Sequence, residues 1–342
     1  MEPVTHGLLG AALGQAFYGR RLDRRALTWG ALACMLPDVD IVMNFTGPMG
    51  EFLHHRGVTH SAWFGPAVGP LLGWLAWRRF GRAPGTFSAW ISLFVAGLFS
   101  HPLLDICTTY GTQFFAPFSG RRFTIDAVAI VDPAYSLILA LAIAAGLWCG
   151  VASSRSRRAA LAALALSTAY LGYGYGLNER VKSGVRARLA AEGVAGSAAD
   201  VQAYPTLLQP YLRRVVVRIG PEVRVGFVSA WRSEARAEWE AFVTTPDPRI
   251  AAAQATPEGR VFEWFASGQT VGQVKQGVSG LVVEIDDLRF GFPGRPEQGL
   301  WGIRVPLDGA GRPTGPVERF NRPLPAPAGL LVQRIFREAF LN

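Results

Sequence analysis

Long apolar stretches in the first half of the chain place the strongest constraint on its fold. A helix that crosses a bilayer needs roughly 20 mostly apolar residues, and residues 61–77, 87–107, 133–152 and 159–177 reach or approach that length. Two shorter runs, at 7–18 and 26–36, are expected to form a helical hairpin that is tilted or partly re-entrant, whose small residues allow close packing. Only 17% of the 342 residues are charged, against about a quarter in soluble proteins. We therefore expect residues 1–177 to form an α-helical polytopic membrane domain with about five to six membrane helices.

The second half of the chain has a different character. Runs of β type occur at 214–219, 223–228, 280–285 and 300–305, and glycine- and proline-rich breaks separate them. Such alternation, together with these breaks, is typical of an antiparallel sheet. Residues 231–242 and 330–340 look helical, and 178–192 looks like a polar helix that leaves the membrane. Residues 178–342 are therefore expected to form a smaller, extramembrane α+β domain.

Clusters of arginine predict how the chain is oriented. A net charge of +9 would suggest a nucleic-acid partner in a soluble protein, but here the arginines flank apolar runs, at 20–25, 78–82 and 155–158. Alternating spans would place all three clusters on one side, which the enrichment of Lys and Arg in cytoplasmic loops makes the cytoplasmic side. Basic residues at 180–188 oppose this orientation, although they begin a long domain, where the rule is weaker. We expect a multi-pass membrane protein with its C-terminal domain on the outer side, membrane lipids as partners and no nucleic-acid partner; the oligomeric state is left open.

All five histidines lie within the first 101 residues, at His6, His54, His55, His60 and His101. Ionisable residues in membrane segments are costly and are functional candidates by default. The predicted topology brings these histidines to one face of the membrane, together with Asp38 and Asp40 at the end of the second run. Asp105 follows His101 by four residues, a spacing that places both side chains on one face of a helix.

These residue types suit a divalent metal ion. Imidazole nitrogens and carboxylate oxygens without thiolates are typical of zinc or a similar ion. The three cysteines form no CxxC pair and are expected to be small buried hydrophobic residues. Arg56 lies in the dense sequence HHRGVTH at residues 54–60, where its guanidinium could hold a phosphate or carboxylate through two hydrogen bonds. Two metals at this loop would activate a water and bind both oxygens of a phosphoester.

Ordinary structural roles remain open for several of these residues. His6 lies near a terminus, and Asp38 and Asp40 follow a proline, where caps and turns are common. One histidine of the pair at 54–55 is expected to face solvent or to support a ligand. Asp126 and Asp132 reach the same face, but Asp132 precedes a proline and is a plausible helix N-cap.

The motifs resemble a membrane-bound metal-dependent hydrolase family that is described as LexA-regulated inner-membrane proteins. The matching segments are residues 5–7, 36–40, 54–61, 100–105 and 130–133, with a looser match at 204–217. The resemblance implies a divalent-metal hydrolase of the bacterial inner (plasma) membrane whose site comprises His6, Asp38, Asp40, His55, His60, His101 and Asp105. The His-x-x-x-Asp element is also similar to one in zinc phospholipase C and related nucleases, which implies phosphoester hydrolysis. No histidine pair follows His101, so a full trinuclear site is not expected.

Three functions are compatible with these features. The first is a hydrolase that uses zinc, or manganese as an alternative, to cleave a phosphoester or lipid ester at the outer face of the membrane. The expected metal ligands are His6, Asp38, His55, His60, His101 and Asp105, and the expected catalytic residues are Asp38, Asp40 and Arg56. The second function is ion or metal transport. The third is a non-catalytic membrane protein whose metal only joins helices.

Overall fold

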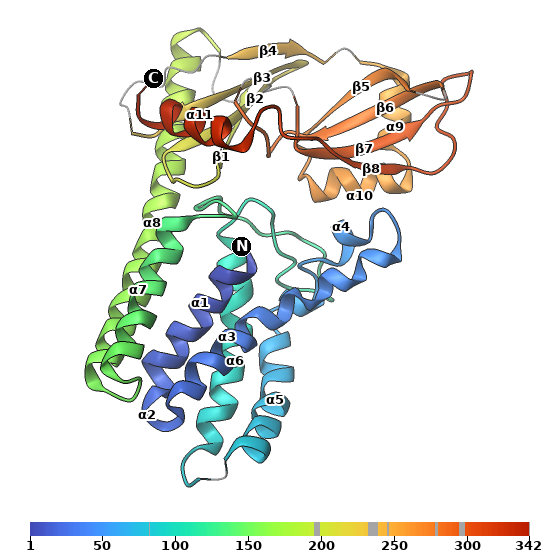
Figure 1. The fold of residues 1–342 in the computed structure, drawn as a ribbon. Coiled ribbons are helices and arrows are strands. Elements are labelled where there is room, and N and C mark those ends of the chain that lie inside the picture. The colour runs from blue at the N-terminus through green and yellow to red at the C-terminus, as the bar shows by residue number, and fades with distance from the viewer. Residues whose placement is uncertain are drawn as a thin grey trace. The chain divides into compact units, whose positions relative to one another are not determined.

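The computed structural model describes residues 1–81, 83–194, 199–231, 239–244, 246–277, 280–293 and 298–341, with the backbone alone for residues 43–45. These residues form two compact units (Figure 1). The first comprises Met1–Val42 and His54–Tyr175, and the second comprises Met43–Leu53 and Gly176–Asn342. The segment 43–53, which lies between two groups of candidate site residues in the sequence, thus belongs to the second unit.

The first unit is helical. Its helices are α1 (Pro3–Leu13), α2 (Gly19–Leu22), α3 (Arg24–Met35), α5 (Phe64–Phe80), α6 (Phe87–Ile106), α7 (Pro133–Cys149) and the first part of α8 (Ser154–Ala191). A π-helical turn, Gly14–Tyr18, follows α1, and 3-10 helices occur at Leu36–Thr46 and Val58–His60. The predicted hairpin of the first two runs is confirmed. The backbones of α1 and α3 approach so closely that a Cβ on Gly10 would lie 2.1 Å from the carbonyl oxygen of Gly30.

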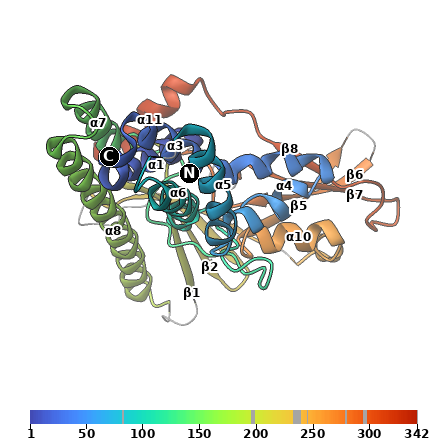
Figure 2. The same cartoon turned by 90° about the horizontal axis from the view of Figure 1, so that it is seen from below.

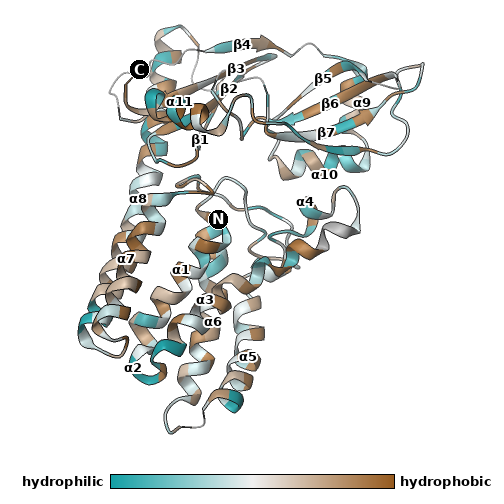
Figure 3. Cartoon of the chain, in the orientation of Figure 1, coloured by the Kyte–Doolittle hydropathy of each residue, from teal (hydrophilic) through white to brown (hydrophobic). Residues whose placement is uncertain are grey.

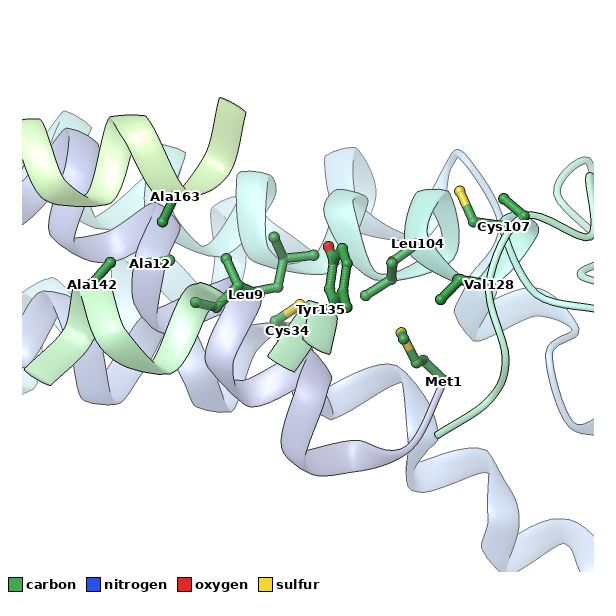
Figure 4. Close-up of a cluster of buried hydrophobic side chains, with 12 residues drawn as sticks. Met1, Leu9, Ala12, Cys34, Leu104, Cys107, Val128, Tyr135, Ala142 and Ala163 are labelled. Carbon is green, nitrogen blue, oxygen red and sulfur yellow. The ribbon is translucent and has the colours of Figure 1, made fainter. Parts of the chain in front are cut away.

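Helix α6 lies at the centre of this unit. It packs against α1, α3 and α5, as the view along the helices shows (Figure 2). Apolar side chains from α1, α3, α6, α7 and α8 form one core cluster, which includes Leu9, Cys34, Leu104, Tyr135 and Leu139 (Figure 4). This packing fixes the C-terminal end of α6 beside the N-terminus of α1.

The expected number of membrane helices is confirmed only in part. Among the described residues, α6 alone is both long and apolar enough to cross a membrane, and α7 is a shorter apolar helix. Hydrophobic colour runs along both, whereas α2, which contains Arg20 and Arg21, is hydrophilic (Figure 3). The last apolar run and the polar helix predicted after it are one continuous helix, α8.

The second unit contains two antiparallel four-stranded sheets, where one sheet was expected. The first has the order β1 (Ala199–Pro205), β2 (Leu212–Ile219), β3 (Glu222–Ser229) and β4 (Glu240–Val243). The second has the order β5 (Thr270–Gly277), β6 (Gly280–Asp287), β7 (Trp301–Pro306) and β8 (Glu318–Asn321). The four predicted strands are confirmed as β2, β3, β6 and β7. The helix predicted at 231–242 is wrong at its end, which forms β4, and residues 232–238 lie outside the described part.

Helices complete the second unit. They are α4 (Gly50–His54, of which residues 50–53 belong here), α9 (Pro248–Gln254), α10 (Pro257–Phe265), the end of α8, and α11 (Ala328–Phe340), which confirms the helix predicted at 330–340. Successive side chains of a strand point to opposite faces of the sheet, and side chains on both faces of β2 are buried. Val215 and Val217 pack in a cluster with Val181 and Val185 of α8, and Val216 packs in a different cluster with Val271 and Leu288.

Candidate metal centre

Three segments of the first unit bring two histidines and two aspartates together. Asp38 lies in the 3-10 helix that follows α3, His60 ends the 3-10 helix before α5, and His101 and Asp105 lie one turn apart on α6. The Nε2 atoms of His60 and His101 are 2.8 Å apart. Asp38 Oδ1 is 3.4 Å from each of them, and Asp105 Oδ2 is 3.3 Å and 3.2 Å away, respectively. The prediction that His101 and Asp105 share a helix face is confirmed, although Pro102 lies between them.

The hydrogen bonds at Nδ1 of His60 and His101 determine whether each ring has a lone pair available at Nε2. The Nδ1–H of His101 donates to the carbonyl oxygen of Cys34 at 2.6 Å. The Nδ1–H of His60 donates to Asp40 Oδ2 at 3.1 Å. Both partners are acceptors only, so each neutral ring has its hydrogen on Nδ1 and a lone pair on Nε2. Two lone pairs and two carboxylate oxygens therefore converge on one point, an arrangement that could hold a metal ion.

A tetrahedral metal ion fits this donor set. With bonds of about 2.0 Å, as for zinc with nitrogen and oxygen, adjacent ligand atoms lie about 3.3 Å apart. Five of the six distances among the four atoms are 2.8–3.4 Å, and all four atoms lie within 4.8 Å of one another. Asp105 Oδ2 is buried and has no hydrogen-bond partner among the described residues. A bound cation would satisfy this oxygen.

The other oxygen of Asp105 accepts hydrogen bonds from two cationic groups and one histidine ring. Asp105 Oδ1 contacts the Met1 amino group, the Nε2 of His6 at 3.2 Å and a guanidinium nitrogen of Arg56 at 3.0 Å. The side chain of Asp105 is completely buried, and an unpaired buried carboxylate would be costly. These contacts fix the carboxylate so that Oδ2 points to the cluster.

Asp40 supports the site without joining the four converging atoms. Its Oδ1 accepts from His55 Nδ1 at 2.7 Å, and its Oδ2 accepts from the Thr59 hydroxyl at 2.7 Å and from the backbone N–H of Arg56 at 3.0 Å. Together with the bond to His60, these contacts let Asp40 fix the orientation of the His60 ring, as a carboxylate commonly does for a histidine in zinc sites. Asp40, His55 and His60 also form a second group whose atoms are close enough to hold an ion.

Electrostatics show that the site demands positive charge. Burial raises the pKa of the Asp38 and Asp40 carboxyls, but hydrogen bonds from His101 and His60 to Asp38, and from His55 and His60 to Asp40, outweigh burial and lower both pKa values. Burial lowers the pKa of His60, yet the surrounding carboxylates of Asp105, Asp38 and Asp40 raise it overall. A proton and a metal ion therefore compete for the Nε2 of His60.

The remaining predicted residues have defined places. His6 is buried and stacks on His101, with ring centroids 3.7 Å apart. Arg56, which was expected to hold a substrate anion, is buried, pairs with Asp105, donates to Thr108 Oγ1 at 2.9 Å and lies over the ring of Tyr110. His54 is exposed, as expected for one member of the pair.

Two further aspartates have local partners. Asp132 is the N-cap of α7 and accepts from the backbone N–H of Tyr135 at 3.0 Å. This confirms the cap interpretation. Asp126 accepts from the Thr124 hydroxyl at 2.9 Å.

One cysteine near the site was not expected there. Cys34 is buried and forms, with His6 and His101, a third group close enough to hold an ion. Its position four residues before Asp38 was the available signal, because the end of α3 leads directly into the candidate site. Cys107 is also buried, as predicted, whereas Cys149 is exposed.

Comparison with known proteins agrees with this geometry. Residues 1–181, just over half of the chain, match the model of the family described as YdjM inner membrane protein. This stretch contains all of the residues that converge on the candidate site. No curated protein and no solved structure matches the chain. The chain therefore belongs to the YdjM inner membrane protein family, a LexA-regulated family of membrane-bound metal-dependent hydrolases.

Proposed function

We propose that this protein is a membrane-embedded hydrolase that uses one divalent metal ion, held by Asp38, His60, His101 and Asp105, to cleave a lipid ester or phosphoester. The convergence of two Nε2 lone pairs with two carboxylate oxygens is the observation that supports it most strongly. Nitrogen and oxygen ligands without a required thiolate favour zinc, with manganese as the alternative. When bound, such an ion polarises an ester or phosphoryl oxygen and lowers the pKa of water.

The surrounding residues divide into positioning and proton-transfer groups. Arg56 and His6 hold one oxygen of Asp105, and Asp40 holds the ring of His60. We therefore assign Arg56, His6 and Asp40 positioning roles. His55 donates its Nδ1–H to Asp40, which leaves Nε2 as the proton-accepting atom of a partly exposed ring. We therefore assign His55 the role of general acid and base in this proposal.

A lipid is the substrate class that the surroundings of the site favour. Each ligand-bearing segment has an exposed apolar side chain within two residues of a ligand: Val39 beside Asp38, Val58 near His60, and Leu103 between His101 and Asp105. Exposed apolar side chains beside buried polar groups suit a molecule with an acyl chain and an ester head. Membership of an inner-membrane family agrees with such a substrate.

The membrane arrangement belongs to the same proposal. The ligands lie at the end of α3, before α5 and at the end of α6, whereas the arginines at 20–25, 78–79 and 155–158 lie at the opposite ends of the helices. We infer that α1, α3, α5, α7 and the first part of α8 lie in the bilayer with α6, that the arginines face the cytoplasm, and that the site faces outward.

A purely structural metal is the second candidate. Catalytic zinc sites usually keep one coordination position for water, whereas structural sites are closed by four protein ligands. Four protein atoms converge here, which favours a closed site. The side chain of Asp38 retains 19% exposure, whereas those of His60, His101 and Asp105 are fully buried. Asp38 is therefore the ligand that a substrate or water can displace in the hydrolase.

Elemental analysis combined with lipid hydrolysis tests the proposal. Detergent-purified wild type should contain stoichiometric zinc or manganese and should release products from phospholipids. His60→Ala and His101→Ala should lose both metal and hydrolysis while still inserting into the membrane. His54→Ala is the matched control, because His54 lies in the same loop but is exposed. Metal that is retained in His101→Ala would sink the ligand assignment, and metal without any hydrolysis would favour the structural role.

A further inference from the structure

One short segment connects the metal site to the C-terminal unit through the chain itself. Residues 43–53 join Asp40 to His55, both of which belong to the first unit, yet they pack as part of the second unit. The end of this segment, residues 49–53, is called the anchor here. Met49 and Phe52 of the anchor are buried, with 6% and 1% exposure. Because these two side chains are buried, the anchor restricts the movement of the residues that adjoin it in the sequence.

The aromatic contacts of the anchor are dense. The ring of Phe52 lies 4.4 Å from that of Phe265 and 5.4 Å from that of Phe262, both in α10. The guanidinium of Arg319, in β8, lies over the same ring at 4.8 Å from its centroid. Phe52 is thus enclosed by aromatic and cationic groups of the second unit, which resist its displacement.

An ion pair between Glu51 of the anchor and Arg319 of β8 also fixes the orientation of the anchor. Both carboxylate oxygens of Glu51 contact the guanidinium of Arg319: Oε2 pairs with one terminal nitrogen and Oε1 with the other at 3.3 Å. Two-point pairing of this kind fixes orientation as well as distance. Glu51 and Phe52 use the same arginine, so the anchor is held at two adjacent positions.

The anchored end leads directly into the turn that contains three site residues. Only Leu53 and His54 separate Phe52 from His55. Backbone bonds from Gly57 to His54 at 2.9 Å and from His60 to Gly57 at 3.0 Å make residues 54–60 a tight turn, and Arg56 adopts a positive φ of 60° within it. We therefore expect a displacement of the first residue of this turn to move the rings of His55 and His60.

We propose that the C-terminal unit positions the metal site through the anchor, so that the grip of Phe262, Phe265 and Arg319 on residues 49–53 keeps His55 and His60 in register with Asp40. The proposal rests on the proposed function for the identity of the site, but the anchoring itself does not require a metal. It gives the C-terminal unit a role in the reaction that is separate from any substrate contact.

Hydrogen exchange of the full-length, metal-free protein tests the anchoring. We expect exchange at residues 54–60 to become at least about tenfold faster in Phe52→Ala, Glu51→Arg and Arg319→Glu, because local opening controls exchange. The double variant Glu51→Arg with Arg319→Glu should restore slow exchange, since the pair is re-formed with reversed polarity. Arg304→Ala is the control: Arg304 pairs with Glu284 in the same sheet and is not part of the anchor contacts.

The zinc affinity of the same variants then distinguishes the positioning role of the anchor from the proposed metal-dependent function. If wild type binds zinc, the three anchor variants should bind it roughly 10-fold to 100-fold more weakly, as for loss of a group that orients a ligand. Unchanged exchange in all three variants, or equally fast exchange in Arg304→Ala, would overturn the anchoring. Faster exchange with unchanged zinc affinity would overturn the positioning role. If wild type binds no zinc, the proposed function fails, and the exchange data still decide whether the anchor holds the turn.

Discussion

His60 and His101 face each other through their Nε2 atoms at 2.8 Å, and the Nδ1 of each ring already donates to a fixed acceptor. Two neutral imidazoles in this arrangement repel one another unless a proton or a metal ion lies between them. The carboxylates of Asp38 and Asp105 complete a site with a local excess of negative charge. The pair is therefore stable only when a positive group is bound.

Metal removal should destabilise the first unit. An ion that binds only the folded state contributes roughly 2.7 kcal/mol when its free concentration is about 100 times Kd. Treatment of wild type with a chelator should lower its melting temperature, and added zinc should restore it. His101→Ala should melt at the same temperature with and without the chelator. A wild-type melting temperature that does not respond to the chelator would contradict this prediction.

Substitutions of Asp38 and Asp40 should reduce metal affinity to different extents, although the two residues are close in the sequence. Asp38→Asn removes a ligand charge, whereas Asp40→Asn only loosens the ring of His60, which should weaken binding by roughly 10-fold to 100-fold. Competition against a chromophoric chelator measures both affinities. Asp38→Asn should show the larger loss. Equal losses would make Asp40 a direct ligand.

The residues that converge in the candidate site could be recognised in the sequence because their types are rare in the surrounding apolar segments. Histidines and aspartates are costly in an apolar half-chain, so His60, His101 and Asp105 were conspicuous. The role of Arg56 was not predictable, since an arginine in a histidine-rich loop suits an anion and a buried carboxylate equally well. Only the structure reveals that Asp105 is its partner.

The C-terminal unit was harder to predict. Strand β2 contains three consecutive valines and β3 contains valines at alternating positions, whereas β5 contains Gly272, Gln273 and Lys275, which lack the apolar pattern that marks a strand. The role of segment 43–53 was also missed, because nothing local to Phe52 indicates that its partners lie more than 200 residues away in α10.

The addition of one methyl group where α1 and α3 approach each other closely should destabilise the protein. Gly10→Ala would place a Cβ 2.1 Å from the Gly30 carbonyl oxygen and 2.5 Å from the Cβ of Cys34. Overpacking of this kind costs typically about 1–3 kcal/mol, and it would also displace the carbonyl of Cys34 that fixes His101. Thermal unfolding and zinc affinity should both decrease. Gly172→Ala in α8 is the control, because its Cβ would meet no atom within 4 Å; a similar loss there would argue against the packing explanation.

The ionic cluster around Glu284 should make the second unit acid-sensitive. Burial raises the pKa of this carboxyl, but hydrogen bonds from Lys275, Arg304 and Arg322 outweigh it and lower the pKa from 4.5 to about 2. Because the folded pKa is depressed, the stabilisation is fully present above the ordinary pKa and is lost as the pH falls from 4.5 towards 2. Glu284→Gln should unfold more easily than wild type at neutral pH. In urea titrations of the full chain, this difference should shrink as the pH falls through that window, and a difference independent of pH would contradict the prediction.

The native cysteines allow a direct test of the proposed orientation. Cys149 is exposed at the end of α7, a short loop away from the arginines at 155–158 at the start of α8, whereas Cys34 and Cys107 are buried. A membrane-impermeant maleimide should therefore label wild type once in inverted inner-membrane vesicles and leave it unlabelled in intact spheroplasts. Arg312→Cys, at a position of high exposure in the C-terminal unit, should show the opposite: in a Cys149→Ser background, it should react in spheroplasts. Labelling of Cys149 from the outside would reverse the topology and place the metal site at the cytoplasmic face, where a substrate would have to come from the inner leaflet.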